Sequence, residues 1–357
     1  MHVAIVNRHR DMSLGGSEIQ CDILARGLQA RGHQITYVAP HTSAPGRALS
    51  SYAYEVMEVA PTARAIVDGI VSVSPDVVYW RFNLSEFLES SRELHGMDLP
   101  IVFAVSHIHD VKRWVLHRRG RRLAGAIRQC LHHARQFDGF RYVSALTVLR
   151  PDLLGRAPVQ LQVPIANAMS AESVPFEWPR PYCAWIANIK SSKRPERAVE
   201  LAGHLEDLGV DVLMIGYVQS ERYRWLLDRT ALPANCHYLG PKPVEEVNGV
   251  LRGCLLHVHT CRPEGFGNVF IQAWLQGRAS VSLGFDPAGV IGRNGLGFDA
   301  GDDFERFTRL VQGLIEDPAA RESIGRRAQS FARATFGEDR LVDEVEELLQ
   351  GVLHGIA

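Results

Sequence analysis

The sequence predicts an α/β protein built from two Rossmann-like domains that follow each other along the chain. At 357 residues the chain exceeds one typical core and suits two domains of roughly 170 residues each. Strand-like and helix-like segments alternate throughout, which is typical of parallel sheets covered by helices on both faces. A break with three prolines, VPFEWPRP, occupies 174–181 and can continue neither a helix nor a central strand.

These observations give the expected boundaries. We predict an N-terminal Rossmann-like domain at 1–173. A linker at 174–181 and a C-terminal Rossmann-like domain at 182–337 follow. The segment 338–357 is expected to be a C-terminal helix, for which packing back on the N-terminal domain is one arrangement.

The predicted elements follow from the apolar spacing. In the first half we expect strands at 2–7, 34–39, 76–80 and 100–105, and a helix at 17–31. In the second half we expect strands at 182–187, 210–215, 236–239, 255–258 and 279–283, helices at 195–208 and 268–276, and a helical tail from 304 that ends in the amphipathic stretch 341–353. Ligands of open α/β sheets lie beyond the carboxyl ends of the strands, so the loops there are the place to look for a site.

Composition excludes several classes of protein. The hydrophobic fraction of 46%, the charged fraction of 22% and a net charge of −1 are ordinary for a globular protein and give no overall attraction to nucleic acid. No apolar run reaches the roughly 18 residues of a membrane span, and MHVAIVNRHR resembles a first strand more than a signal peptide. The six cysteines are scattered without a CxxC pair, so we expect reduced thiols and a cytoplasmic location.

The most informative stretch is HTCRPEGFGNVFIQAWLQG. It places Glu264 before the turn Gly265, Phe266 and Gly267, and helical spacing begins at Asn268. Glycines let a backbone approach a ligand closely, and a helix N-terminus offers unpaired N–H groups to an anion. A carboxylate beside such a place can accept hydrogen bonds from sugar hydroxyls. The combination predicts a site for a sugar linked to a phosphate, as in a sugar nucleotide.

This stretch resembles the donor-site signature of the retaining glycosyltransferases of family 4, which have the GT-B fold: two Rossmann-like domains facing a central cleft. In that family a Glu, a glycine-rich turn and a second Glu eight positions on bind the donor. Glu264 matches the first Glu, but Gln272 stands at the second position. The second carboxylate of the family holds the nucleotide ribose. We predict that Gln272 still faces the ribose, because Val269, Phe270 and Ala273 define the buried face of the helix.

Two glycines, Gly15 and Gly16, follow the first strand and open the first helix. Ser17 could cap that helix, with Gln20 completing a capping box. Glycines before a helix N-terminus form a second candidate anion site, although an ordinary turn is the alternative. The loop resembles the one that meets the donor phosphate and transferred sugar in family 4.

A basic loop follows the first strand of the second half. In the family, an Arg and a Lys five residues apart neutralise the pyrophosphate leaving group here. Lys193 matches the Lys, but Asn188 stands at the Arg position. Lys190 or Arg194 could supply the missing charge, and the sequence leaves that choice open.

The strand at 100–105 runs into His107, Ile108, His109 and Asp110. By the resemblance, a His after this strand contacts the donor sugar or its acceptor; His107 fits best and His109 is the reserve. The alternatives are a structural loop histidine and a metal site made by His107, His109 and Asp110. The chain has no Asp-x-Asp pair, the usual metal–nucleotide device of the other major glycosyltransferase fold. We therefore expect metal-independent chemistry with no cofactor.

The segment 112–135 carries eight Lys or Arg and no acidic residue, interleaved with apolar side chains. Such a stretch can lie on an anionic membrane surface, which would suit a lipid-linked acceptor. A solvated face of a core-packed helix is the alternative. An RNA-binding role is weaker, because the rest of the chain has no aromatic-basic platform.

The resemblance implies a retaining glycosyltransferase of the hexosyltransferase type. It would move a sugar from a UDP- or GDP-sugar to an acceptor hydroxyl, without an enzyme nucleophile. Glu264 would orient the sugar, and Lys193 with the Gly16 loop would stabilise the leaving group. The stretch 281–297 is similar to bacterial members that assemble surface polysaccharides or glycoconjugates. The alternatives are a sugar-nucleotide-binding protein without transfer activity, and a nucleotide-sugar epimerase or phosphorylase on the same fold.

Overall fold

A computed structural model describes residues 1–12, 15–41, 52–81, 86–115, 123–262 and 264–355. It divides into two compact units, one formed by Met1–Ala168 with Glu338–Ala357 and the other by Met169–Gly337. The first unit therefore ends five residues before the predicted boundary at 173. The predicted linker, 174–181, lies in the second unit, where the Val174 amide donates to the Glu245 carbonyl at 3.1 Å.

The first unit is built on a parallel sheet of seven strands in the order β3-β2-β1-β4-β5-β6-β7. The strands are β1 (His2–Val6), β2 (Gln34–Pro40), β3 (Glu55–Val59), β4 (Val77–Trp80), β5 (Ile101–Val105), β6 (Ala145–Val148) and β7 (Leu161–Pro164). In the central pairs Val3 lies opposite Ile35 of β2 and Val77 of β4. The central strands are continuous apolar runs because helices cover both faces of the sheet.

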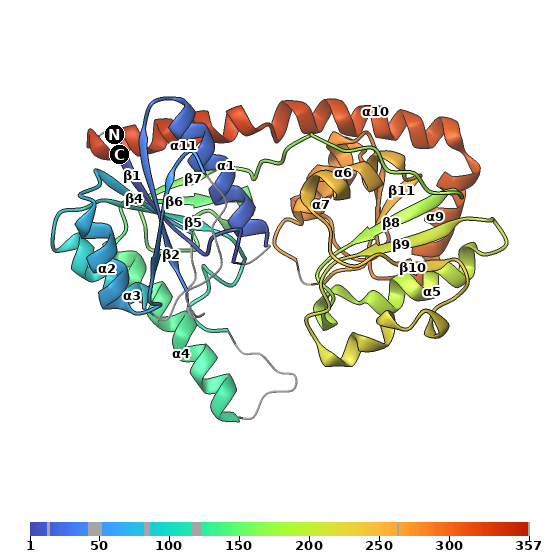
Figure 1. The fold of residues 1–357 in the computed structure, drawn as a ribbon, viewed down its shortest axis with the longest axis horizontal. Helices are drawn as coiled ribbons and strands as arrows, with labels where there is room; N and C mark the ends of the chain where they lie inside the picture. Colours follow the sequence, from blue (N-terminus) through green and yellow to red (C-terminus); the bar gives the residue numbers. More distant parts are fainter. Residues whose placement is uncertain (13–14, 42–51, 82–85, 116–122, 263, 356–357) are drawn as a thin grey trace. The chain divides into compact units, whose positions relative to one another are not determined.

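The helices of this unit are α1 (Gly16–Ala30), α2 (Ala63–Ser72), α3 (Phe87–His95), α4 (Leu123–Gly139) and α11 (Glu338–Leu353). The last helix of the chain packs along α1 (Figure 1), burying Val345 and Leu349 in the same core as Leu24. Arg31, just after α1, pairs with Asp343 at 2.6 Å. An apolar face and a charged edge thus attach the C-terminal helix to the first unit.

The second unit holds a parallel sheet of six strands in the order β10-β9-β8-β11-β12-β13. These are β8 (Tyr182–Ile186), β9 (Asp211–Ile215), β10 (Cys236–Tyr238), β11 (Leu256–His259), β12 (Ser280–Ser282) and β13 (Gly297–Asp299). The helices are α5 (Pro195–Leu205), α6 (Val244–Gly253), α7 (Asn268–Leu275), α8 (Val290–Asn294), α9 (Phe304–Glu316) and α10 (Pro318–Thr335).

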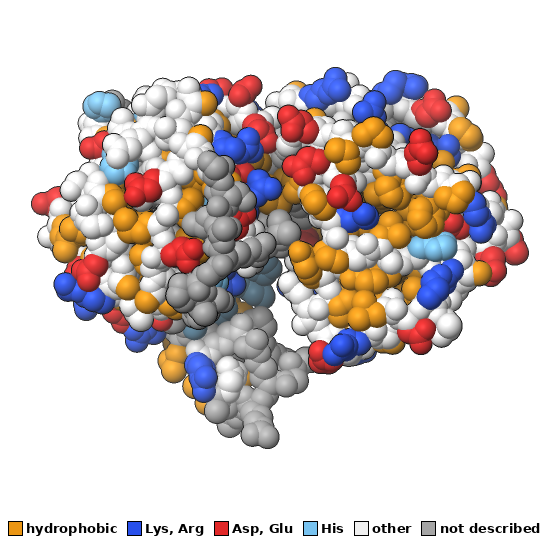
Figure 2. Space-filling view, in the orientation of Figure 1, with side chains coloured by type: hydrophobic (Ala, Val, Ile, Leu, Met, Phe, Trp, Pro, Cys, Tyr) orange, Lys and Arg blue, Asp and Glu red, His pale blue; other side chains and the backbone are white. Residues whose placement is uncertain are grey.

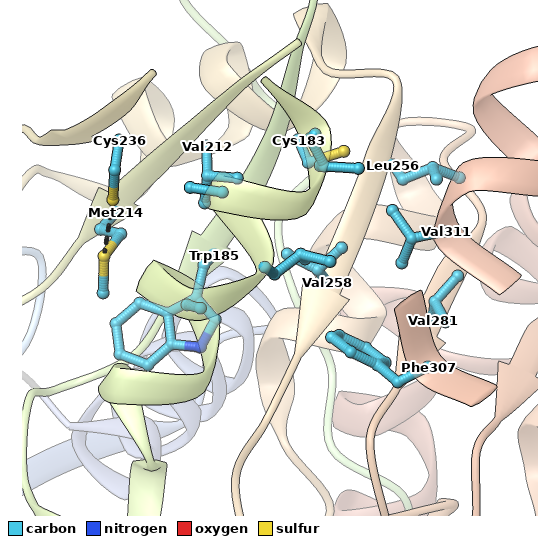
Figure 3. Packing of buried hydrophobic residues seen from close by; sticks show 14 of the residues in the cluster. Cys183, Trp185, Val212, Met214, Cys236, Leu256, Val258, Val281, Phe307 and Val311 are labelled. Carbon is cyan, nitrogen blue, oxygen red and sulfur yellow. Dashed lines mark hydrogen bonds between the residues drawn. The ribbon is translucent and has the colours of Figure 1, made fainter. Parts of the chain in front are cut away.

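The core of the second unit lies between this sheet and the helices around it. Figure 3 shows Trp185, Val258 and Phe307 within one buried cluster. Full burial of side chains of this size stabilises the fold by about 1.5–3 kcal/mol each. The indole nitrogen of Trp185 donates to the Thr260 hydroxyl at 2.8 Å, which links the core to the loop after β11.

The structure confirms the predicted α/β class with two parallel sheets and a helical C-terminus. All nine predicted strands are present, whereas β3, β6, β7 and β13 were not predicted. All six cysteines are free thiols. No helix within the described ranges combines the length and the hydrophobicity that a membrane crossing requires.

Candidate functional site

The loops that follow β8 and β11 lie at one edge of the second sheet, because these strands are parallel neighbours. Lys193 ends a short 3₁₀ turn after β8, and Glu264 lies in the loop after β11. The Lys193 ammonium donates to the Glu264 carboxylate, and the two side chains are 16% and 18% exposed. Burial alone would lower the pKa of Lys193, but Cys261 and Glu264 outweigh burial and raise it. The lysine is therefore charged at neutral pH.

Hydrogen bonds to backbone carbonyls hold the two loops together in addition to this ion pair. The Thr260 hydroxyl donates to the Lys193 carbonyl at 2.7 Å and receives the Trp185 indole N–H at 2.8 Å. The Arg194 guanidinium donates to the Thr260 carbonyl. The backbone at Lys193 is thus positioned by the core of the unit, independently of its side chain.

Arg194 is committed to the framework of the loops. Its backbone is left-handed, with φ of 48°, and it stands at the N-terminus of α5. Its guanidinium pairs with Asp302, which also pairs with Arg262 at 2.8 Å. Hydrogen bonding from Arg194, with a contribution from Arg262, lowers the pKa of the Asp302 carboxyl. This pairing occupies a residue that could otherwise contact a ligand.

Two further residues of the basic loop differ from Arg194. Lys190 is exposed and forms no ion pair with a described residue. Asn188, at the position of the family's Arg, accepts a hydrogen bond from the Tyr217 amide at 3.4 Å. Of the two candidates for the missing charge, Lys190 is the one whose ammonium is not engaged by the loop itself.

The glycine turn before α7 depends on its glycine for shape. Gly267 has φ of 81°, and an added Cβ would meet the Phe270 ring at 3.0 Å, so another residue would be strained there. Phe266 is buried, with its ring centroid 5.4 Å from that of Phe336. The Gly265 amide donates to its neighbour Glu264 at 3.1 Å. The turn therefore places the carboxylate directly before α7, which begins at Asn268.

Gln272 lies deeper than predicted. It is 7% exposed, whereas Val269 is only half-buried, so the predicted division between buried face and ligand face is wrong at these two positions. The reason is α6, which packs on α7 and brings Asn248 to within 3.0 Å of the Gln272 amide nitrogen. Contact of Gln272 with a ribose stays a prediction.

The same loops contain a group of possible metal ligands that the sequence analysis missed. Among the residues that the structure describes, ligand atoms of His259, Cys261 and Glu264 lie within 4.8 Å of one another. Burial lowers the pKa of His259 and raises the pKa of the Cys261 thiol to about 12. The spacing HxCxxE was visible in the sequence, but nothing in it showed that the three side chains converge.

In the first unit, the glycine loop is arranged differently from the prediction. The residue before α1 is Gly15, which has no side chain to cap the helix, and α1 begins at Gly16. Ser17 instead donates to Glu18 at 2.9 Å, and Gln20 exchanges two hydrogen bonds with the Ala168 backbone. The predicted capping box is therefore wrong, because the helix starts earlier and Gln20 is used for tertiary packing.

His107 lies in a tight turn after β5. One oxygen of Asp110 accepts the backbone amides of Ser106 at 2.8 Å and of His107 at 2.7 Å. The ring centroids of His107 and His109 are 4.6 Å apart. The side-chain carboxylate of Asp110 thus holds the backbone of the turn and fixes the position of His107.

Arg81 follows β4 and is a buried cation that was not among the predicted site residues. It is 8% exposed and donates to the Asn167 side chain at 2.6 Å. No described carboxylate forms an ion pair with it. A single Arg after a strand matches no motif, so the sequence alone did not indicate Arg81 as a candidate site residue.

Comparison with known families decides what the second unit is. Residues 180–317 match the family model of the glycosyl transferases group 1. The chain is a glycosyltransferase. Lys193, Glu264 and Gln272 lie within the matched segment, whereas Gly15, Gly16 and His107 lie outside it.

Solved structures similar to this glycosyltransferase show the fold. The sucrose-phosphate synthase of Thermosynechococcus elongatus is 13% identical, with 99% of each chain covered and a TM-score of 0.81. HepE of Anabaena, in complex with UDP and glucose, is 15% identical over 98% of this chain and 100% of its own, with a TM-score of 0.73. WaaG, a glycosyltransferase involved in lipopolysaccharide biosynthesis, is 13% identical over 98% and 100%, with a TM-score of 0.72. The predicted GT-B fold is confirmed. A comparison with curated protein sequences finds no match.

Proposed function

We propose that this glycosyltransferase moves a sugar from a UDP- or GDP-sugar to an acceptor hydroxyl with retention of anomeric configuration. The observation that carries the proposal is the Lys193–Glu264 pair at the carboxyl edge of β8 and β11, directly before α7. A cation suited to phosphate and a carboxylate suited to sugar hydroxyls meet there beside a helix N-terminus. A sugar nucleotide carries both groups in adjacent positions.

The bound donor would exchange partners within this pair. The diphosphate takes the charge of Lys193, and exposed Lys190 adds a second positive charge in place of the family's Arg. Glu264, released from the lysine, accepts hydrogen bonds from the sugar hydroxyls. Amides at the start of α7 face the phosphate. Leaving-group charge is then neutralised by lysine and backbone donors, so the reaction proceeds without a metal.

In the transfer step the acceptor oxygen forms a bond to the anomeric carbon as the bond from that carbon to the phosphate oxygen breaks. The departing phosphate oxygen takes the acceptor proton on the same face of the sugar, which gives retention. Gly15 and Gly16 of the first unit would approach the donor phosphate and sugar. His107 would contact the sugar or the acceptor.

The assay that tests this proposal has two stages. UDP-, GDP- and ADP-sugars are screened by thermal shift, since a ligand of the native state raises the apparent stability. The donor that binds is then followed with and without a carbohydrate acceptor, and the product anomer is assigned by NMR. Transfer with retention, unaffected by EDTA, is the expected result. Binding without turnover indicates a sugar-nucleotide-binding protein, and isomerised donor without acceptor indicates an epimerase.

We further propose a lipid-linked acceptor in polysaccharide or glycoconjugate assembly, reached at an anionic membrane surface. Around α4, Trp114, Ile127 and Leu131 are 62%, 51% and 54% exposed. Basic side chains, including exposed Arg128, lie among them, and Figure 2 shows orange and blue side chains together on the described surface of α4. Exposed apolar side chains beside positive charge are the features of an interfacial helix.

Vesicle co-sedimentation tests the membrane contact. The protein should bind vesicles containing anionic phospholipid more than neutral ones, and Leu131→Ser should reduce that binding severalfold. Leu227→Ser is the matched control, because Leu227 is 55% exposed in the second unit. Equal losses in the two variants, or no preference for anionic vesicles, would refute the assignment to α4.

A further inference from the structure

Three side chains at the end of β11 and in the loop after it have the chemistry and spacing of a metal site. His259 ends β11, Cys261 follows it, and Glu264 lies in the turn before α7. One ligand atom from each lies within 4.8 Å of the others. Zinc bonds of about 2.0–2.3 Å place the ligand atoms of a tetrahedral ion roughly 3.3–3.8 Å apart. A closure of about 1 Å therefore brings the three groups onto one ion.

The two ring nitrogens of His259 differ in their surroundings. Its Nδ1 lies 3.4 Å from the Ser282 hydroxyl on β12, while its Nε2 is buried without a hydrogen-bond partner. A buried polar atom without a partner is costly, and a bound cation would satisfy it. Ligating histidines usually have their second ring nitrogen held by a neighbour, which Ser282 does here.

The chemical types of the three ligand atoms determine which metals the site favours. Thiolate and imidazole favour zinc and other borderline-soft ions, whereas magnesium and calcium prefer ligands that are all oxygen. Three protein ligands leave a fourth coordination position open, as in exchangeable zinc sites. His259 and Cys261 are buried, while Glu264 is 18% exposed. An ion would therefore enter past Glu264.

We propose that His259, Cys261 and Glu264 form an inhibitory site for a zinc-class divalent cation, which competes with Lys193 for the Glu264 carboxylate. The inhibitory role rests on the proposed donor site. An entering ion must displace the Lys193 ammonium from Glu264, and the carboxylate can no longer accept sugar hydroxyls. Ion and donor thus exclude each other. The positive charge of Lys193 weakens metal binding, so occupancy is reversible by chelation.

Cobalt(II) is the probe, because a thiolate ligand gives it a charge-transfer absorption that reports binding without any measure of transfer. The reduced full chain should show this band and saturate at about one equivalent, as a single three-ligand site requires. Cys261→Ser should abolish the band. Cys130→Ser, which alters a partly exposed thiol on α4, is the matched control and should retain it. Melting temperatures verify the fold of both, and His259→Gln provides a second variant of the site.

Lys193→Ala distinguishes the cation site from the donor site, because it should strengthen cobalt binding and weaken nucleoside diphosphate binding. Loss of the competing ammonium should tighten cobalt binding at least threefold, while loss of the phosphate contact weakens nucleoside diphosphate binding. Zinc should inhibit transfer competitively with donor, EDTA should reverse the inhibition, and Cys261→Ser should resist zinc at least tenfold better than wild type. A missing cobalt band, a band that survives Cys261→Ser, or weaker cobalt binding by Lys193→Ala would overturn the cation site. Normal cobalt behaviour without donor binding would instead overturn the donor site.

Discussion

The two units hold their candidate site residues by different means. In the second unit, charged side chains from loops after different strands form pairs: Lys193 with Glu264, and Arg194 with Asp302. In the first unit, the turn at His107 is held by backbone amides on Asp110, and Gly15 contributes backbone alone. The charged network coincides with the segment that matches the glycosyltransferase family. The paired charged residues among the candidate site residues therefore lie in the second unit, and the uncharged candidates Gly15 and Gly16 lie in the first.

The largest expected effect comes from removing the carboxylate of that network. Glu264→Ala should lower kcat/KM for transfer at least tenfold, about 1.4 kcal/mol of transition-state stabilisation, because the sugar loses its acceptor. His107→Ala, the comparator in the first unit, should lower it less. Steady-state kinetics of the folded variants decide the matter. A larger loss for His107→Ala would break the comparison between the units.

Gln272 tests how far the second unit resembles its family. Gln272→Leu should reduce the free energy of unfolding by about 1 kcal/mol, because the hydrogen bond to Asn248 is lost. It should also raise the donor KM, whereas Gln272→Glu should preserve or lower that KM if residue 272 faces the ribose. Chemical denaturation and donor kinetics report the two effects separately. If the leucine variant has the wild-type donor KM, residue 272 does not contact the donor and serves only in packing.

Lys190 and Arg194 sharpen the comparison within one loop. Lys190→Ala should weaken binding of the nucleoside diphosphate about threefold without changing the melting temperature, because its exposed ammonium makes no ion pair in the described structure. Arg194→Ala should lower the melting temperature, since its guanidinium joins Asp302 to the Thr260 carbonyl. The reverse pattern would make Arg194 the substitute for the family's Arg.

The smallest expected effect is a pH dependence of stability. The pKa of Asp302 is lowered in the folded protein, chiefly by Arg194. A lowered carboxyl pKa contributes stability above the unfolded value, and that contribution is lost as the pH falls through the folded value. Wild type should therefore be more stable than Asp302→Asn at neutral pH, and the difference should begin to shrink as the pH falls below about 4 and vanish only below the lowered pKa of the folded state. A difference that stays constant down to pH 3 would exclude this ionic contribution.

The sequence predicted the fold well where strands are buried. Most interior parallel strands are apolar runs and were found, although the four-residue interior strand β6 was missed despite its burial. The other two strands missed in this sheet, β3 and β7, are partly exposed edge strands whose polar residues obscure the pattern. Strand β13 has only three residues, Gly297–Asp299, which is too short to show a periodicity.

The candidate site was predictable only in its local part. Glu264 with its glycine turn, and Lys193 with its basic loop, each lie in a short motif with a physical meaning. The Arg194–Asp302 pair joins positions 108 residues apart, and Asn248 reaches Gln272 from another helix. Such partners depend on tertiary packing, which no local pattern contains. The same limitation hid the convergence of His259 and Cys261 on Glu264.

Lys193 is proposed to bind the diphosphate of a sugar nucleotide. This contact can be measured by isothermal titration of the 357-residue chain with UDP and GDP, using Lys193→Ala and the control Lys242→Ala, whose lysine pairs with Glu246 on α6 in the same unit. We expect one of the two nucleotides to bind wild type and Lys242→Ala equally and to bind Lys193→Ala about tenfold more weakly. Unchanged affinity in Lys193→Ala, or no binding of either nucleotide to wild type, would contradict it.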